Sequence, residues 1–140
     1  MGFGQAISSG FKNYVNFSGR AMRSEFWWWF LFVWLVGVAA NLVDMAMGRG
    51  SWELTQNAEG VYTYSYENLG IFGSLWALAI ILPTIAVAIR RLHDTDHSGW
   101  WWLLGFVCCI GPLILIFAFY IQPGTPGDNR FGPPRQPNTV

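Results

Sequence analysis

The sequence FWWWFLFVWLVGVAANLV fills residues 26–43 without a single Lys, Arg, Asp or Glu. Two more segments of this kind follow, at residues 69–89 and residues 100–121. As α-helices, with a rise of about 1.5 Å per residue, the three would be roughly 27–33 Å long, and the hydrocarbon core of a bilayer is about 30 Å thick. The sequence therefore predicts an integral membrane protein, with three crossings as the default expectation.

Composition supports the same class of protein. Hydrophobic residues make up 53% of the chain and charged residues only 11%, whereas roughly 25% of a soluble domain is charged. The formal net charge is zero and the basic residues are spaced apart, so nothing indicates a nucleic-acid partner. We expect the first hydrophobic segment to stay as an anchor, because it is too long for a removable signal peptide and lacks a small-residue cleavage pattern.

These features predict an all-α fold, an integral membrane helical bundle of three hydrophobic helices in one domain covering residues 1–140. Residues 1–25 form an interfacial N-terminal segment, and residues 122–140 form a polar tail of turn formers. Apolar side chains recur at helical spacing in the N-terminal segment: Ile7, Phe11, Tyr14 and Val15. This spacing favours a short amphipathic helix on the membrane surface, although Gly10 lowers its helical propensity. The three tryptophans at residues 27–29 are expected at headgroup level.

The third hydrophobic segment is interrupted by Gly111 and Pro112. It is either one kinked crossing or a helical hairpin that returns to its side of entry. The hairpin would place seven basic residues in the cytoplasm and one outside, instead of five and three. Its halves would reach only about 15 Å, however, and the backbone at the turn would need partners. On hydropathy we expect one crossing, and both arrangements put the N-terminus and the loop at residues 90–99 in the cytoplasm.

The longest polar connection, residues 44–68, is acidic apart from Arg49. Residues 61–66 alternate as in a strand, and residues 57–60 fit the turn of a small hairpin. We expect an irregular loop instead, with its tyrosines at the interface, and we place Asp44 just beyond the hydrocarbon.

Small residues repeat at four-residue spacing in the second hydrophobic segment, Gly70 with Ser74 and Gly73 with Ala77. Such a face lets another helix approach closely, which makes a homo-oligomer plausible. The only two cysteines, Cys108 and Cys109, are adjacent within the third segment. We expect them to be packing residues, because neither a disulfide framework nor a metal site follows from such a pair.

Residues 90–99, RRLHDTDHSG, form the most unusual polar sequence in the chain. Two histidines four residues apart, with aspartates close by, raise the hypothesis of a metal site at His93, Asp94, Asp96 and His97. We favour a structural role, in which Arg90 and Arg91 anchor the end of a span at phosphate level and the aspartates neutralise neighbouring arginines. No resident metal and no cofactor are therefore expected.

A polar cluster at the cytoplasmic face is the candidate site for anionic lipid or a protein partner. Its members are Arg20, Arg23, Glu25, Arg90, Arg91, His93, Asp94, Asp96 and Arg130. Arg130 is expected to pair with the aspartates of residues 90–99. No nucleophile and base pattern or phosphate-binding glycine loop occurs, so we do not expect an enzyme. A proton relay would need a charge at the bilayer centre, and none is predicted there.

Three motifs carry a resemblance to a known family: FSGRAMRSEFW at residues 17–27, RRLHDTDHSGWW at residues 90–101, and PGTPGDNRFGP at residues 123–133. In this order they resemble the DUF805 family of small bacterial inner-membrane proteins. His97 stands where many relatives carry Arg, and residues 44–68 depart from the family in length. The resemblance implies a location and an architecture, but it implies no particular activity.

We therefore expect a structural or interaction component of the bacterial inner membrane, with membrane lipids and an unidentified membrane protein as candidate partners. The first alternative is an oligomeric channel or transporter subunit, and the second is a metal-dependent function at residues 90–99.

Overall fold

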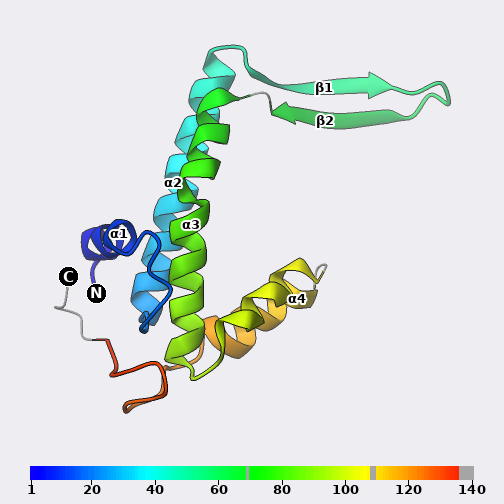
Figure 1. The fold of residues 1–140 in the computed structure, drawn as a ribbon. Coiled ribbons are helices and arrows are strands. Elements are labelled where there is room, and N and C mark those ends of the chain that lie inside the picture. The colour runs from blue at the N-terminus through cyan, green and yellow to red at the C-terminus, as the bar shows by residue number, and fades with distance from the viewer. Residues whose placement is uncertain (69, 108–109, 136–140) are drawn as a thin grey trace. The chain divides into compact units, whose positions relative to one another are not determined.

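The computed structural model describes residues 1–68, 70–107 and 110–135 (Figure 1). The elements are α1 (Phe3–Lys12), α2 (Arg23–Ala46), β1 (Gly50–Gln56), β2 (Tyr62–Asn68), α3 (Ile71–Asp94), the 3-10 helix η1 (Gly99–Phe106), α4 (Ile110–Ile114) and the π-helix η2 (Leu115–Tyr120). They belong to two compact units. The first unit comprises Met1–Phe32 and Ile81–Val140, and the second comprises Val33–Ile80.

Helices α2 and α3 are the two helices, among the described residues, that are long and apolar enough to cross a membrane. Each has 24 residues and is therefore roughly 36 Å long. In the most apolar 18-residue stretch of each helix, only 11% of α2 and 22% of α3 is buried within the protein. Trp34 and Leu78, for example, are 58% and 67% exposed. So much exposed apolar surface is unfavourable in water. The first two predicted spans therefore have the surface that lipid-facing helices have.

The third hydrophobic segment folds as a hairpin of short helices, so the expectation of a single crossing is wrong. The first arm, η1, ends at Phe106, and the second arm begins with α4 at Ile110 and continues as η2. The ring centroids of Trp101 and Phe119 lie 5.6 Å apart, which shows that the second arm returns along the first.

Gly111 explains how the two arms come so close. A Cβ atom on Gly111 would lie 1.7 Å from the carbonyl oxygen of Leu104, so only glycine allows this approach. Pro112 is the third residue of α4, where its missing amide leaves no helical hydrogen bond unmade. Gly111 and Pro112 both lie within α4, at the start of the second arm. Cys108 and Cys109 lie outside the described residues.

Residues 50–68 form an antiparallel hairpin, so the predicted irregular loop is wrong and an all-α description is incomplete. β1 pairs with β2 from Gly50 opposite Asn68 to Gln56 opposite Tyr62. Asn57 organises the turn, because its Oδ1 accepts hydrogen bonds from the amides of Glu59 and Val61 at 3.1 and 2.9 Å.

In the second unit, the end of α2 is joined to the start of α3 by a buried carboxylate. Asp44 is 0% exposed and accepts hydrogen bonds from the amides of Phe72 and Gly73, at 3.2 and 2.8 Å. These amides belong to the first turn of α3, where no intrahelical acceptor exists and a negative charge is favoured. A Cβ on Gly73 would lie 3.3 Å from the Asn41 side chain, so Gly73 packs against α2 of the same chain.

In the first unit, α1 confirms the predicted N-terminal helix and packs its aromatic side chains on α2. The rings of Phe11 and Trp29 lie 5.3 Å apart, and those of Phe3 and Trp28 5.6 Å apart. A Cβ on Gly10 would lie 2.2 Å from the Trp29 ring, so this glycine is what lets the helices meet. Trp29 is consequently 1% exposed and belongs to the core of the first unit.

Candidate functional site

The polar motifs of the first unit converge around the carboxylate of Asp94, the last residue of α3. Asp94 Oδ1 accepts a hydrogen bond from Arg20 Nε at 2.9 Å, and its Oδ2 accepts one from Arg91. Arg20 is 4% exposed and Arg91 is 0% exposed. A buried charge is costly unless it is paired and hydrogen-bonded, and here one carboxylate holds two guanidinium groups.

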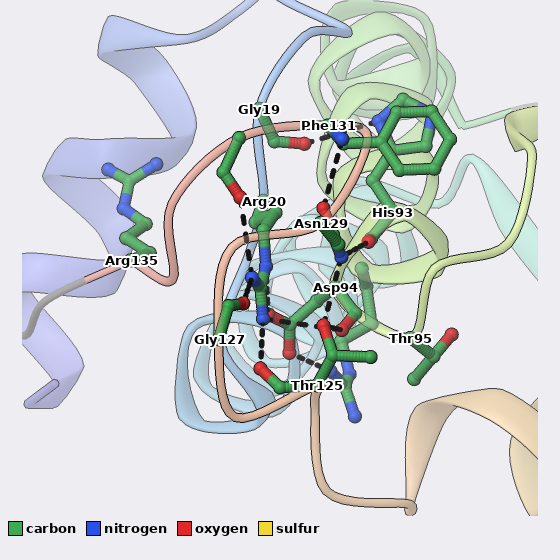
Figure 2. Close-up of polar contacts among 12 residues, drawn as sticks. Gly19, Arg20, His93, Asp94, Thr95, Thr125, Gly127, Asn129, Phe131 and Arg135 are labelled. Atoms are coloured by element: carbon green, nitrogen blue, oxygen red, sulfur yellow. Dashed lines mark hydrogen bonds and ion pairs between the residues drawn. The ribbon is translucent and has the colours of Figure 1, made fainter.

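Arg20 also holds the C-terminal tail. Its Nη2 donates to the carbonyl of Thr125 at 2.6 Å, and its Nη1 donates to the carbonyl of Gly127 at 2.7 Å. Figure 2 shows the guanidinium group between Asp94 and the loop that carries these carbonyls. The planar group of arginine has five donors in a fixed fork, which suits this combination of a carboxylate and two carbonyls.

The tail returns these contacts through its own backbone and side chains. The amide of Thr125 donates to the carbonyl of Asp94 at 2.8 Å. Asn129 Nδ2 donates to the carbonyl of His93 at 2.8 Å and to Thr125 Oγ1 at 2.9 Å. These bonds satisfy carbonyls at the end of α3 that have no helical donor. We call the contacts of Arg20, Arg91 and Asp94 with residues 122–132 the tail clamp.

A ring stack and an ion pair also join the tail to residues 93–96. The ring of His93 stacks on Phe131, as Figure 2 shows. The two ring centroids lie 3.9 Å apart, and His93 Nδ1 lies 3.1 Å from the carbonyl oxygen of Gly19. Arg130 Nε lies 3.3 Å from Asp96 Oδ1, which is the pairing predicted between the tail and residues 90–99. Since both side chains of that pair are about half exposed, the ion pair contributes little stability.

A second buried carboxylate, Glu25, gathers residues from α1, α3 and the tail. Glu25 Oε1 accepts hydrogen bonds from Ser9 Oγ at 2.7 Å and from Arg90 Nη1 at 3.0 Å. Its Oε2 lies 3.3 Å from Arg135 Nε, and Arg135 Nη2 donates to Ser9 Oγ at 2.7 Å. Glu25 is 0% exposed and Arg90 is 1% exposed. We call these four residues the Glu25 cluster.

Positive charge is in excess across these two centres. Within the described residues, Arg20, Arg90, Arg91 and Arg135 share the two carboxylates Asp94 and Glu25. Several of their nitrogens also have no hydrogen-bond acceptor in the described part of the chain: Arg90 Nε and Nη2, Arg91 Nε and Arg135 Nε. Buried donors of this kind are favourable partners for an anion.

The structure places the two histidines of residues 90–99 in different surroundings. Helix α3 ends at Asp94, and Asp96 has a φ of 60°, so residues 93–97 do not share one helix face. His97 contacts Phe119 of η2, with ring centroids 4.6 Å apart, while His93 stacks on the tail. The described residues contain no group of three or more metal-ligating side chains.

Sequence reasoning placed most of the buried charges but missed the groups that bind them. Many of the contacts around the buried charges come from groups that the sequence did not single out: the tail backbone, Gly124, Asn129, Ser9 and Arg135. Arg23, which was predicted to belong to the cluster, is exposed and makes one long contact with the carbonyl of Ile121, at 3.4 Å. The turn formers of the tail were a signal for close backbone packing. Nothing local in the sequence marks Ser9 or Arg135 as a partner of Glu25.

Comparison with known proteins adds a family. The family model described as "Protein of unknown function (DUF805)" matches residues 14–133. The Escherichia coli (strain K12) inner membrane protein YhaI is 42% identical over 121 residues, covering 86% of each chain. Inner membrane protein YhaH of the same strain is 43% identical over 122 residues, covering 87% of this chain and 88% of the relative. No solved structure matches the chain.

Proposed function

We propose that this chain, which belongs to the DUF805 family of proteins of unknown function, is an inner-membrane protein that binds anionic phospholipid at its cytoplasmic interface. The names of its relatives support the location, and the two lipid-facing helices support the membrane-embedded form. The bound lipid would make the protein an interaction component of the membrane rather than a catalyst.

The contacts of the tail support a particular orientation. The N-terminal segment, the end of α3 and the tail all bind one another within the first unit. Seven of the eight Lys and Arg residues lie in these parts of the chain, and Arg49 lies in the second unit. Because positively charged loops stay in the cytoplasm, this distribution favours a cytoplasmic face for the tail clamp and the Glu25 cluster.

The hairpin of η1, α4 and η2 supports the same orientation. Its two arms have 8 and 11 residues and so reach roughly 16 Å each, about half of the hydrocarbon core. A segment of this length enters and leaves on one side, which keeps the tail beside the cytoplasmic charges.

The observation that carries the proposal is the unbalanced charge of the buried arginines. Four guanidinium groups share two carboxylates, and four of their nitrogens lack an acceptor in the described residues. Lipid phosphates at the cytoplasmic interface carry the negative charge that would balance these arginines and the oxygen atoms that would accept their hydrogen bonds.

The experiment compares a zwitterionic lipid with an anionic one. Purified protein in nanodiscs of phosphatidylcholine would be titrated with phosphatidylglycerol while native mass spectrometry counts retained lipid. We expect selective retention of phosphatidylglycerol that weakens as salt rises. Equal retention of the two lipids would contradict the proposal.

A further inference from the structure

A hollow between α1 and the tail is a pocket of the right size for a headgroup. It is an open hollow of about 740 Å³, and ordinary ligand pockets have roughly 300–1,000 Å³. Its walls come from the end of α1, the connection to α2, and the tail segment that contains Phe131 and Arg135. All of them belong to the first unit.

We infer that this pocket binds one phosphate group through Lys12, Arg20 and Arg135. The inference rests on the proposed function, since it assigns the place where the anionic lipid binds. Among the described residues that line the pocket there are three cations and no carboxylate. The hydroxyl of Ser18 is a further donor on the wall, whereas the amides of Asn13 and Asn16 already donate to the Ser9 carbonyl and to Asn13 Oδ1. Phosphate oxygens accept hydrogen bonds from cations and hydroxyl groups of this kind.

The three cations of the pocket have different amounts of unused binding capacity. Arg20 already serves Asp94 and the tail carbonyls, so it contributes mainly its charge. Lys12 is exposed, and no acceptor for its ammonium group is found in the described residues. Lys12 is therefore the donor best able to turn toward a ligand.

Arg135 lines the pocket and also belongs to the Glu25 cluster, where positive charge is in excess. It shares Glu25 with Arg90, so two guanidinium groups meet one carboxylate. The Nε of Arg135 lies 3.3 Å from Glu25 Oε2 without the alignment of a hydrogen bond, and it has no other acceptor in the described part of the chain. A phosphate beside Arg135 would neutralise the second of these positive charges.

The surroundings of the pocket favour a lipid as the source of the phosphate. α1 also exposes Phe3 and Phe11, which are 39% and 44% exposed, so apolar surface lies on the helix that forms one wall. An amphipathic helix with such residues lies at the level of the headgroups. Free phosphate shares the chemistry, and the experiment must separate the two sources.

The test uses the full-length protein with two substitutions at the pocket and one control. Lys12→Gln removes an exposed charge, and Arg135→Gln removes the pocket charge while Arg90 still pairs with Glu25. Arg49→Gln removes a cation from the second unit and serves as the matched control. Circular dichroism and gel filtration would establish that each variant is folded.

Binding would be measured by native mass spectrometry with phosphatidylglycerol nanodiscs, and by ³¹P NMR with inorganic phosphate. We expect each pocket substitution to weaken phosphatidylglycerol binding roughly five- to tenfold, the usual effect of losing one charge-assisted contact. Lys12→Gln alone decides the result if Arg135→Gln does not fold. Arg49→Gln should change binding less than about twofold, because Arg49 does not line the pocket.

Each other outcome is informative. Phosphatidylglycerol binding that is unchanged in both pocket variants would overturn this site and leave the proposed function standing. Phosphate binding that depends on Lys12, without lipid binding, would support the site and overturn the proposed function. Absence of binding for both probes would overturn both.

Discussion

Gly124 of the tail lies directly against the carboxylate of Asp94. A Cβ atom at position 124 would be 2.1 Å from Asp94 Oδ2, which is far shorter than any contact between non-bonded atoms. The tail can reach the end of α3 only because this residue has no side chain, and the amide of Thr125 then donates to the Asp94 carbonyl at 2.8 Å.

Gly124→Ala should therefore loosen the tail clamp. Forcing a methyl group into a packed contact costs about 1–3 kcal/mol, so we expect a lower thermal unfolding temperature and faster proteolysis of residues 122–135. Gly127→Ala is the matched control, because a Cβ there would meet nothing within 4 Å. Equal stability of the two variants would show that the Gly124 contact is unimportant.

Gly10→Ala should separate α1 from α2. The added methyl group would overlap the ring of Trp29, which lies 2.2 Å from the position of that Cβ. Hydrogen exchange of the amides in α1 should accelerate, although alanine raises helical propensity. Gly4→Ala shares the propensity gain and meets nothing within 4 Å, so it should leave the exchange of α1 unchanged or slower.

Arg20→Lys should weaken the protein although it keeps the charge. A lysine ammonium cannot reproduce the fork that bonds Asp94, Thr125 and Gly127 together. Leaving buried acceptors without donors costs about 1–3 kcal/mol each. Arg130→Lys, at a side chain that is 59% exposed, should cost less than about 0.5 kcal/mol. Chemical denaturation in detergent would compare them, and equal losses would argue against the forked geometry of Arg20.

The tail and the N-terminal segment should face the same side of the membrane. Single cysteines introduced by Asn16→Cys and Asp128→Cys, in a chain whose Cys108 and Cys109 are replaced by serine, should react with an impermeant maleimide from the cytoplasmic side only. Both native residues are exposed, so the labels have access. Labelling from opposite sides would reinstate a third crossing in place of the hairpin.

Local sequence was sufficient for the two long helices of this fold. Residues 26–43 and 71–89 are helical, since an uncharged apolar run of that length has few alternatives in a bilayer. A helix in the N-terminal segment also follows from its periodicity, although α1 ends at Lys12, before Tyr14 and Val15. The hairpin at residues 50–68 was visible in the alternation, but the irregular loop was preferred because alternation cannot show whether two strands will pair.

What only the tertiary structure decided is which groups meet. Arg20 and Asp94 are 74 residues apart, and Ser9 and Arg135 are 126 apart, so no local pattern links them. The return of the third segment likewise depends on the contact between Gly111 and Leu104, although the hydropathy of one kinked crossing would be the same. Hydropathy and helical propensity are properties of neighbouring residues, and they determined that the chain enters the membrane. The pairing of buried charges is a property of the folded chain, because a buried charge must be matched by whatever group the fold brings within hydrogen-bonding distance.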